Sequence, residues 1–128
     1  MENNYLYSEI TDKIIREAYH VYNTLGYGFL EKVYENSMMK KLEDCGLKAE
    51  QQKPIKVIFE NKIVGEYFAD IIVENKIIIE LKAIESLNPI HEIQLLNYLK
   101  ATNIEVGLLI NFGKKIEIRR KVNQRKSG

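Results

Sequence analysis

The sequence predicts a mixed α/β domain of the α+β kind, in which helices pack on one mixed β-sheet. Two observations predict this class. Apolar residues recur at three- and four-residue steps in the first third of the chain, and β-branched and aromatic runs replace them in the middle. A further helix and two more strands follow, which gives the order α-α-β-β-β-α-β-β. The length of 128 residues suits a single domain, residues 1–128.

The first third predicts two helices. An apolar stripe runs from Ile10 to Leu25, and Ser8 or Thr11 could cap the start of this helix. Two glycines in the segment 26–28 predict a helix end and a sharp reversal of the chain. A second stripe extends from Leu30 to Cys45.

The middle third predicts three antiparallel strands in a meander. The strand-like runs are Pro54–Phe59, Ile63–Val73 and Ile77–Leu81. The tetrapeptide Glu-Asn-Lys-Ile occurs at Glu60–Ile63 and again at Glu74–Ile77, between these runs. Because Asn tolerates the positive φ of tight hairpins, both copies predict turns.

The last third predicts a helix followed by two strands. Asn88 is the expected N-cap and Pro89 the first residue of a helix from Ile90 to about Ala101. Glu105–Asn111 then predicts a buried strand, and Lys115–Val122 predicts an alternating edge strand.

Composition narrows the class of protein. Hydrophobic residues make up 45% and charged residues 29%, which is typical of globular proteins and argues against disorder. No apolar run approaches the ~20 residues of a membrane-spanning helix, so no membrane association is expected. The first residues lack the pattern of a signal peptide, and the lone Cys45 cannot form an internal disulfide. A cytoplasmic location is therefore expected.

Three charged residues fall within strands that should be buried: Asp70, Glu80 and Lys82. Isolated charges are costly in a low dielectric, so their placement requires a reason. Glu80 and Lys82 are two apart and leave the same face of one strand. A three-residue loop, Glu74–Lys76, would place Asp70 directly opposite Glu80, whereas a two-residue loop would put Asp70 on the other face. The cluster therefore predicts a loop of odd length.

Two explanations fit this cluster. Neighbouring carboxylates raise each other's pKa unless a cation lies between them, and hard cations such as Mg²⁺ bind through carboxylate oxygens and water. A nearby lysine could then orient a water or stabilise charge on a phosphate. The alternative is a partly exposed sheet face that carries a structural ion-pair cluster. The spacing alone leaves both explanations open.

Several motifs occur in a recognisable order along the chain. Asp70 is followed after nine residues by Glu80-Leu81-Lys82, and Gly28, Glu31 and Tyr34 form a Gly-x-x-Glu-x-x-Tyr pattern. Gln94 and Tyr98 form a Gln-x-x-x-Tyr motif within 91–99, and a strand and turn follow at 107–113. Together these motifs resemble the GxxExxY protein family of the PD-(D/E)XK nuclease superfamily, from about Ile10 to Arg120. The chain departs from the superfamily pattern at Ala69, where the proline of the motif would stand.

The resemblance implies a restriction-endonuclease-like core and a metal-dependent nuclease that hydrolyses phosphodiester bonds in nucleic acid, with DNA favoured over RNA. Asp70 and Glu80 would hold one or two Mg²⁺ or Mn²⁺ ions, and Glu31 would be a further ligand. Lys82 would position the attacking water or stabilise the transition state. Gln94 would orient the site, and Tyr98 would contact the nucleic acid.

Some of these residues have structural alternatives. With Gly28 as N-cap, Glu31 would be the third helical residue and would complete a capping box. Tyr34 could pack in the core or contact substrate, and the pair Gln94 and Tyr98 could be merely solvated on its helix face. His91 is expected to be a hydrogen-bonded or surface residue rather than a metal ligand.

The net charge of +1 hides a strong asymmetry. Residues 114–128 carry seven basic residues and one acidic residue, a net charge of +6, and residues 1–113 carry a net charge of −5. Arg119, Arg120 and Lys121 in this basic end are candidates for binding phosphates. The alternative is a solvated tail, especially beyond Asn123.

A second class of function stays open at this point. The chain could be a nucleic-acid or protein interaction module that keeps a nuclease fold without turnover. A chain of 128 residues leaves little room for a separate substrate-reading domain, so a homodimer or a partner protein could supply selection.

Overall fold

The computed structural model describes residues 6–123 and contains the expected order of elements. Its helices are α1 (Ser8–Leu25), α2 (Glu31–Asp44) and α3 (Pro89–Thr102). Its strands are β1 (Ala49–Phe59), β2 (Lys62–Val73), β3 (Ile77–Lys82), β4 (Val106–Phe112) and β5 (Ile116–Val122). The predicted fold class is therefore confirmed.

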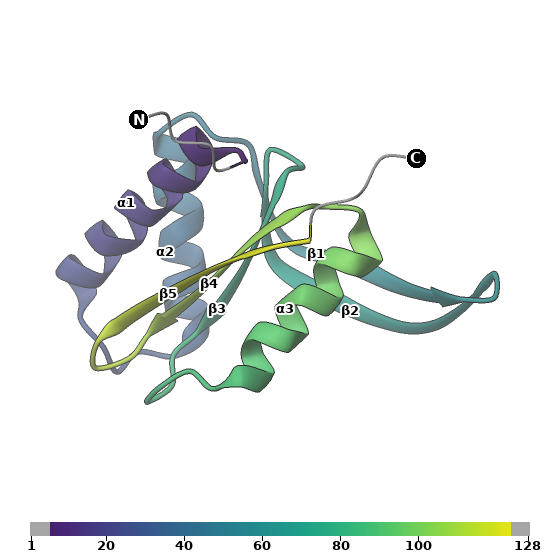
Figure 1. The fold of residues 1–128 in the computed structure, drawn as a ribbon. Helices are drawn as coiled ribbons and strands as arrows, with labels where there is room; N and C mark the ends of the chain where they lie inside the picture. The colour runs from purple at the N-terminus through teal and green to yellow at the C-terminus, as the bar shows by residue number, and fades with distance from the viewer. Residues whose placement is uncertain (1–5, 124–128) are drawn as a thin grey trace.

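The five strands form one sheet in the order β1-β2-β3-β4-β5. β3 and β4 are parallel and are connected by α3, whereas the other neighbours are antiparallel. β5 lies at an edge, as predicted. Helices α1 and α2 cover one face of the sheet and α3 covers the other, so the sheet is the middle layer of three (Figure 1).

Two apolar clusters hold these layers together. The larger one joins α1 and α2 to the sheet and includes Ile14, Met38, Ile79 and Leu108. The smaller one joins α3 to the other face and includes Leu95 and Ile78. Alternate residues of β3 therefore serve different cores, which explains why this strand is apolar at almost every position. No helix in the part of the chain that the structure describes is long and apolar enough to cross a membrane.

Both copies of the repeated tetrapeptide form turns, as predicted. Glu60 and Asn61 have φ of 49° and 65° and make a two-residue hairpin, because Phe59 pairs with Lys62. Glu74 and Asn75 both have φ of 55°, but here the loop extends over Glu74–Lys76 because Val73 pairs with Ile77. The predicted loop of odd length is confirmed.

The predicted caps are correct for α3 and wrong for the first two helices. The Asn88 side chain accepts the Ile90 N–H, and His91 Nδ1 accepts the Asn88 N–H, which completes a capping box. Tyr7 precedes α1 without a side-chain cap, because Thr11 lies inside the first turn and its hydroxyl donates to the carbonyls of Tyr7 and Ser8.

The capping role predicted for Glu31 is also wrong. Leu30 is the N-cap of α2, so Glu31 is the first helical residue rather than the third. Gly28 lies two residues before that cap with φ of 109°, and the neighbouring Phe29 N–H donates to the Tyr34 hydroxyl instead. The carboxylate of Glu31 therefore does not cap helix α2.

Candidate active site

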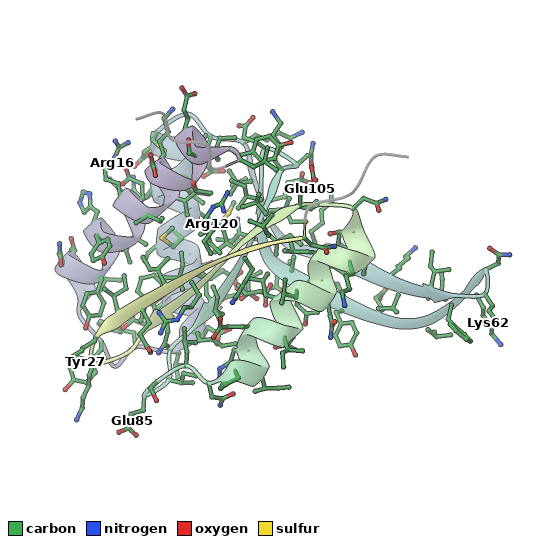
Figure 2. All side chains as sticks on the ribbon, in the orientation of Figure 1. Arg16, Tyr27, Lys62, Glu85, Glu105 and Arg120 are labelled. Atoms are coloured by element: carbon green, nitrogen blue, oxygen red, sulfur yellow. The ribbon has the colours of Figure 1, made fainter. Side chains whose placement is uncertain are left out.

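The sheet forks where Asp70 and Glu80 meet. Ladder pairing between β2 and β3 covers three residue pairs, from Val73 and Ile77 to Ile71 and Ile79. Beyond this point β2 turns away from β3 and continues with β1 as a projecting two-stranded arm, residues 53–68 (Figure 1). Figure 2 labels Lys62 at the tip of the arm. The register puts Asp70 opposite Glu80 at the fork.

Side chains replace the main-chain ladder at the fork. The Asp70 N–H donates to Glu80 Oε2 over 3.0 Å, and the Leu81 N–H donates to Asp70 Oδ2 over 2.8 Å. Each carboxylate is thus bound by the backbone of the opposite strand. The two acids predicted to lie together do so, and their orientation is fixed by main-chain donors.

Both carboxyl groups are held at a raised pKa. Glu80 is 7% exposed, and burial followed by the nearby charge of Asp70 raises its pKa to about 8. Burial also raises the pKa of Asp70, with the charge of Glu35 adding to the effect. Hydrogen bonds from main-chain N–H groups oppose this shift but do not cancel it. Burial therefore favours the neutral, protonated form of both carboxyl groups.

Lys82 and Glu31 face the same region. The positive charge of Lys82 lowers the pKa of Glu31, Asp70 and Glu80, which places it within electrostatic reach of all three. Burial and then the charge of Asp70 raise the pKa of Glu31. Glu31 thus lies near the pair, at the start of the helix that approaches the fork.

Sequence reasoning missed a buried acid, Glu35. This residue of α2 is 2% exposed, and its Oε2 accepts hydrogen bonds from Lys32 Nζ over 3.0 Å and from Gln51 Nε2 over 2.6 Å. Its Oε1 accepts a hydrogen bond from Gln52 Nε2 over 3.0 Å. A signal was present, since Glu35 directly follows the buried Tyr34 and lies three residues before Met38 in the apolar stripe.

Gln52 was also missed, and it connects Glu35 to the carboxylate pair. Its Nε2 lies 3.4 Å from Asp70 Oδ1 as well as 3.0 Å from Glu35 Oε1. Its φ of 51° is in the left-handed region that favours glycine. Strained backbone of this kind concentrates at functional sites. The positive φ of Gln52 could not be predicted from the residue type, glutamine.

Gln94 and Tyr98 lie on α3 with the tyrosine turned toward the fork. Gln94 Nε2 donates to the Tyr98 hydroxyl over 3.2 Å. Tyr98 is 7% exposed, and burial followed by the charge of Glu80 raises its pKa. Its ring lies 5.5 Å from the ring of Tyr67 on the arm. The alternative of a solvated pair is therefore wrong for Tyr98, which is packed between α3 and the arm.

Tyr34 belongs to the core instead of the site. Its ring stacks on Phe112 at a centroid distance of 4.5 Å, and the residue is fully buried. Its hydroxyl donates to the Gly26 carbonyl over 2.7 Å and accepts the Phe29 N–H over 3.2 Å. The expectation that Tyr34 contacts substrate is corrected here, because neither its ring nor its hydroxyl is available.

The basic residues of β5 do not form one surface, which corrects the expectation that they bind phosphates together. Arg120 points toward α1 and donates to the Leu6 carbonyl over 2.8 Å (Figure 2). Arg119 and Lys121 leave the other face, because neighbouring strand residues alternate. Arg119 is ion-paired with Glu117 at 3.6 Å, and Lys121 is ion-paired with Glu92. Arg125 and Lys126 lie outside the described residues.

A family model for the PD-(D/E)XK nuclease superfamily matches residues 8–123. The chain belongs to this superfamily. A comparison with curated proteins gives no significant match.

A solved structure supports the superfamily fold. The crystal structure of SSO0001 aligns with a TM-score of 0.55 and 22% sequence identity, over 93% of this chain. The chain spans 60% of the length of SSO0001. The sheet with its flanking helices is therefore a restriction-endonuclease-like fold.

PD-(D/E)XK nucleases generally use divalent metal ions, and the carboxylate pair suits such an ion. No group of three acidic, histidine or cysteine side chains among residues 6–123 is close enough to enclose a metal. Mg²⁺, however, keeps several waters and takes only one or two carboxylates from the protein. Asp70 and Glu80 each use one oxygen for a main-chain N–H, which leaves Glu80 Oε1 and, beside the long contact from Gln52, Asp70 Oδ1. The donor set therefore fits a partly hydrated hard cation.

Proposed function

We propose that this chain is a metal-dependent nuclease that hydrolyses phosphodiester bonds in nucleic acid, with DNA favoured over RNA. Asp70 and Glu80 would hold one or two Mg²⁺ or Mn²⁺ ions, with Glu31 as a further or water-mediated ligand. One observation carries the proposal. At the fork of the sheet, the carboxylates of Asp70 and Glu80 each accept a hydrogen bond from a main-chain N–H of the opposite strand. Gly28, Glu31 and Tyr34 also support membership of the GxxExxY family within the superfamily.

Several residues of the chain would each have a separate role in hydrolysis. A bound divalent cation supplies Lewis acidity and lowers the pKa of a bound water. The main-chain N–H groups of Asp70 and Leu81 hold the two carboxylates in place before any ligand arrives. Lys82 would position the attacking water or stabilise charge on the phosphate. Gln94 orients the Tyr98 hydroxyl, which lies near the charge of Glu80.

Cleavage of defined oligonucleotides tests this proposal. Single- and double-stranded DNA and RNA are incubated with Mg²⁺, Mn²⁺ or EDTA, and with the variants Glu80→Gln and Asp70→Asn. Glu85→Gln is the matched control, because Glu85 is an exposed acid in the loop after β3 (Figure 2). Cleavage that needs a metal ion, persists in the control and is lost in both variants supports the proposal. Cleavage that is equal in all variants overturns it.

A gel-shift measurement of binding with the same oligonucleotides and variants distinguishes the non-catalytic alternative. An interaction module would bind nucleic acid in EDTA or metal without breaking it, and Glu80→Gln would leave that binding unchanged. A cytoplasmic location and a role for a homodimer or partner protein stay predictions from the sequence.

A further inference from the structure

A groove of about 790 Å³ lies between α3 and the arm. The groove walls include Tyr67 of the arm and Gln94 and Tyr98 of α3. Tyr98 connects the groove to the fork, since the charges of Glu80 and Asp70 contribute to its raised pKa. Tyr67 is three residues before Asp70 on β2, a span of about 10 Å along an extended strand.

The groove offers an aromatic face at its exposed side. Tyr67 is 48% exposed, whereas Tyr98 is 7% exposed and lies against it with the rings tilted by 44°. The hydrogen bond from Gln94 fixes Tyr98, which in turn supports the Tyr67 ring. A rigid, half-exposed ring in a groove provides a stacking platform for a planar group.

The polar lining of the groove suits a nucleotide. No acidic residue lines the groove among the described residues. This is notable in a region, residues 1–113, with a net charge of −5. The amides of Gln94 and Asn97 can donate to and accept from a base edge.

The apolar part of the lining favours an unpaired strand over a paired duplex as the occupant. Ile58, Ile90 and Ile93 are among the lining residues, and each is at least half exposed. A duplex presents phosphates on its outside and keeps its bases stacked inside, so it has no planar apolar surface to fill such a groove. An unpaired strand exposes its base faces, and aromatic side chains in grooves bind such faces by stacking.

We infer that this groove binds an unpaired segment of the nucleic acid, with a base stacked on Tyr67. The inference deepens the proposed nuclease function and rests on it, because Tyr98 of the groove wall lies within electrostatic reach of Glu80 and Asp70. The preferred substrate is thus a single strand or a frayed end.

Fluorescence anisotropy in EDTA tests this inference without cleavage. The probes are a labelled oligothymidine and a labelled duplex of equal length. The full chain should bind the single strand more tightly than the duplex. Tyr67→Ala should weaken single-strand binding roughly 5- to 100-fold, since stacking on one aromatic side chain is worth ~1–3 kcal/mol per base. Tyr67→Phe should keep most of the affinity.

A matched control comes from α1, on the opposite face of the sheet. Tyr19 is 46% exposed, so Tyr19→Ala removes an equally exposed tyrosine and should leave binding unchanged. Ile93→Glu adds a negative charge to the groove wall and gives an independent test if Tyr67→Ala unfolds, which thermal denaturation reveals.

Two outcomes overturn the inference. The first is equal affinity for single strand and duplex, and the second is unchanged single-strand affinity in both Tyr67→Ala and Ile93→Glu. If a dimer also dissociates in these two variants, the second outcome identifies a second copy of the chain as the occupant. If the protein shows metal-dependent cleavage but Tyr67→Ala leaves single-strand affinity unchanged, the inferred role of the groove is refuted and the nuclease proposal stands. Groove-dependent binding without any cleavage would refute the nuclease proposal alone.

Discussion

Gln52 lies directly across the β1–β2 ladder from Asp70, and its side-chain Nε2 is 3.4 Å from Asp70 Oδ1. The neighbouring pairs, Gln51 with Ile71 and Lys53 with Ala69, show that both strands keep their register through this point. Side-chain alternation nevertheless breaks in β2, since Ala69 and Ile72 both belong to the core beneath α3 although they are three residues apart. The positive φ of Gln52 and this break together mark where the arm leaves the sheet.

Replacing Gln52 should weaken metal binding without removing a ligand. Gln52→Ala loses the amide between Glu35 and Asp70, and loss of a group that orients a ligand costs roughly 10- to 100-fold in metal affinity. Isothermal titration with Mn²⁺ measures the affinity. Gln51→Ala is the control, because Gln51 contacts Glu35 and Asn36 but not Asp70. Equal effects of the two substitutions would contradict a specific role for Gln52.

The stability of the metal-free protein should fall as pH rises. The pKa of Glu80 is about 8 in the folded protein against 4.5 for an ordinary glutamate, so the folded state holds an extra proton between these values. The stabilisation from the neutral form is complete below about pH 4.5 and is lost as pH rises through about 8. The change in the free energy of unfolding should be a few kcal/mol, since one pKa unit corresponds to about 1.4 kcal/mol.

Urea denaturation in EDTA between pH 5 and pH 9 measures this profile. Glu80→Gln keeps an acceptor for the Asp70 N–H but cannot ionise, so its profile should be flatter than that of the wild type. A Glu80→Gln profile as steep as the wild-type profile would show that another group causes the pH dependence.

A divalent ion should reverse this dependence. Binding between Asp70 and Glu80 requires both groups to be ionised, so it releases a proton from Glu80 below pH 8 and strengthens as pH rises. Mg²⁺ or Mn²⁺ should therefore raise the melting temperature more at pH 8.5 than at pH 6. At a concentration of 100 times Kd the gain is about 2.7 kcal/mol. Differential scanning calorimetry measures the shift, which should disappear in Asp70→Asn and persist in Glu85→Gln.

The position of the carboxylate pair could be predicted from the sequence because strand geometry is periodic. Once Asp70, Glu80 and Lys82 were assigned one face, parity required a loop of odd length, and the structure contains the three-residue loop Glu74–Lys76. The α3 start could be predicted for a similar reason, since the Asn-Pro pair at Asn88 encodes a local cap.

The missed residues depend on tertiary structure. Glu35 turns inward because Lys32, Gln51 and Gln52 supply donors, and two of these come from a strand that begins before the predicted run. The conformation of Gln52 is set by the bend of the arm rather than by its own preference. Arg120 was wrongly expected to bind phosphate, because a count of charges ignores the alternation of side chains along a strand. This alternation places Arg120 on the face where it contacts the Leu6 carbonyl.

Asn111 should be essential for the segment that follows Lys82. Its Oδ1 accepts the Ile84 N–H over 2.9 Å, and its Nδ2 donates to the Ile84 carbonyl over 3.0 Å and to Glu117 over 2.9 Å. The residue is fully buried, so Asn111→Ala leaves buried groups unpaired and should cost about 2–4 kcal/mol of unfolding free energy. Urea denaturation checks this value. Lys115→Ala, an exposed change in the adjacent turn, should stay within about 0.5 kcal/mol of the wild type.

Glycine should be required at position 113 because there is no room for a side chain beside the segment that follows Lys82. A Cβ there would lie 2.4 Å from the Ile84 carbonyl oxygen and 3.1 Å from the Glu85 carbonyl oxygen, so the main chain after β3 would have to move. Gly113→Ala should lower the free energy of unfolding by about 1–3 kcal/mol, as is usual for overpacked sites.

Gly65 provides a matched control for the prediction about Gly113→Ala. A Cβ at Gly65 in the arm meets no atom closer than 3.9 Å, so Gly65→Ala should be nearly neutral in the same denaturation experiment. Because the displaced segment directly follows Lys82, Gly113→Ala should also reduce metal-dependent cleavage measured at a temperature where the variant stays folded. A folded Gly113→Ala protein with wild-type cleavage would show that the segment after β3 does not position Lys82.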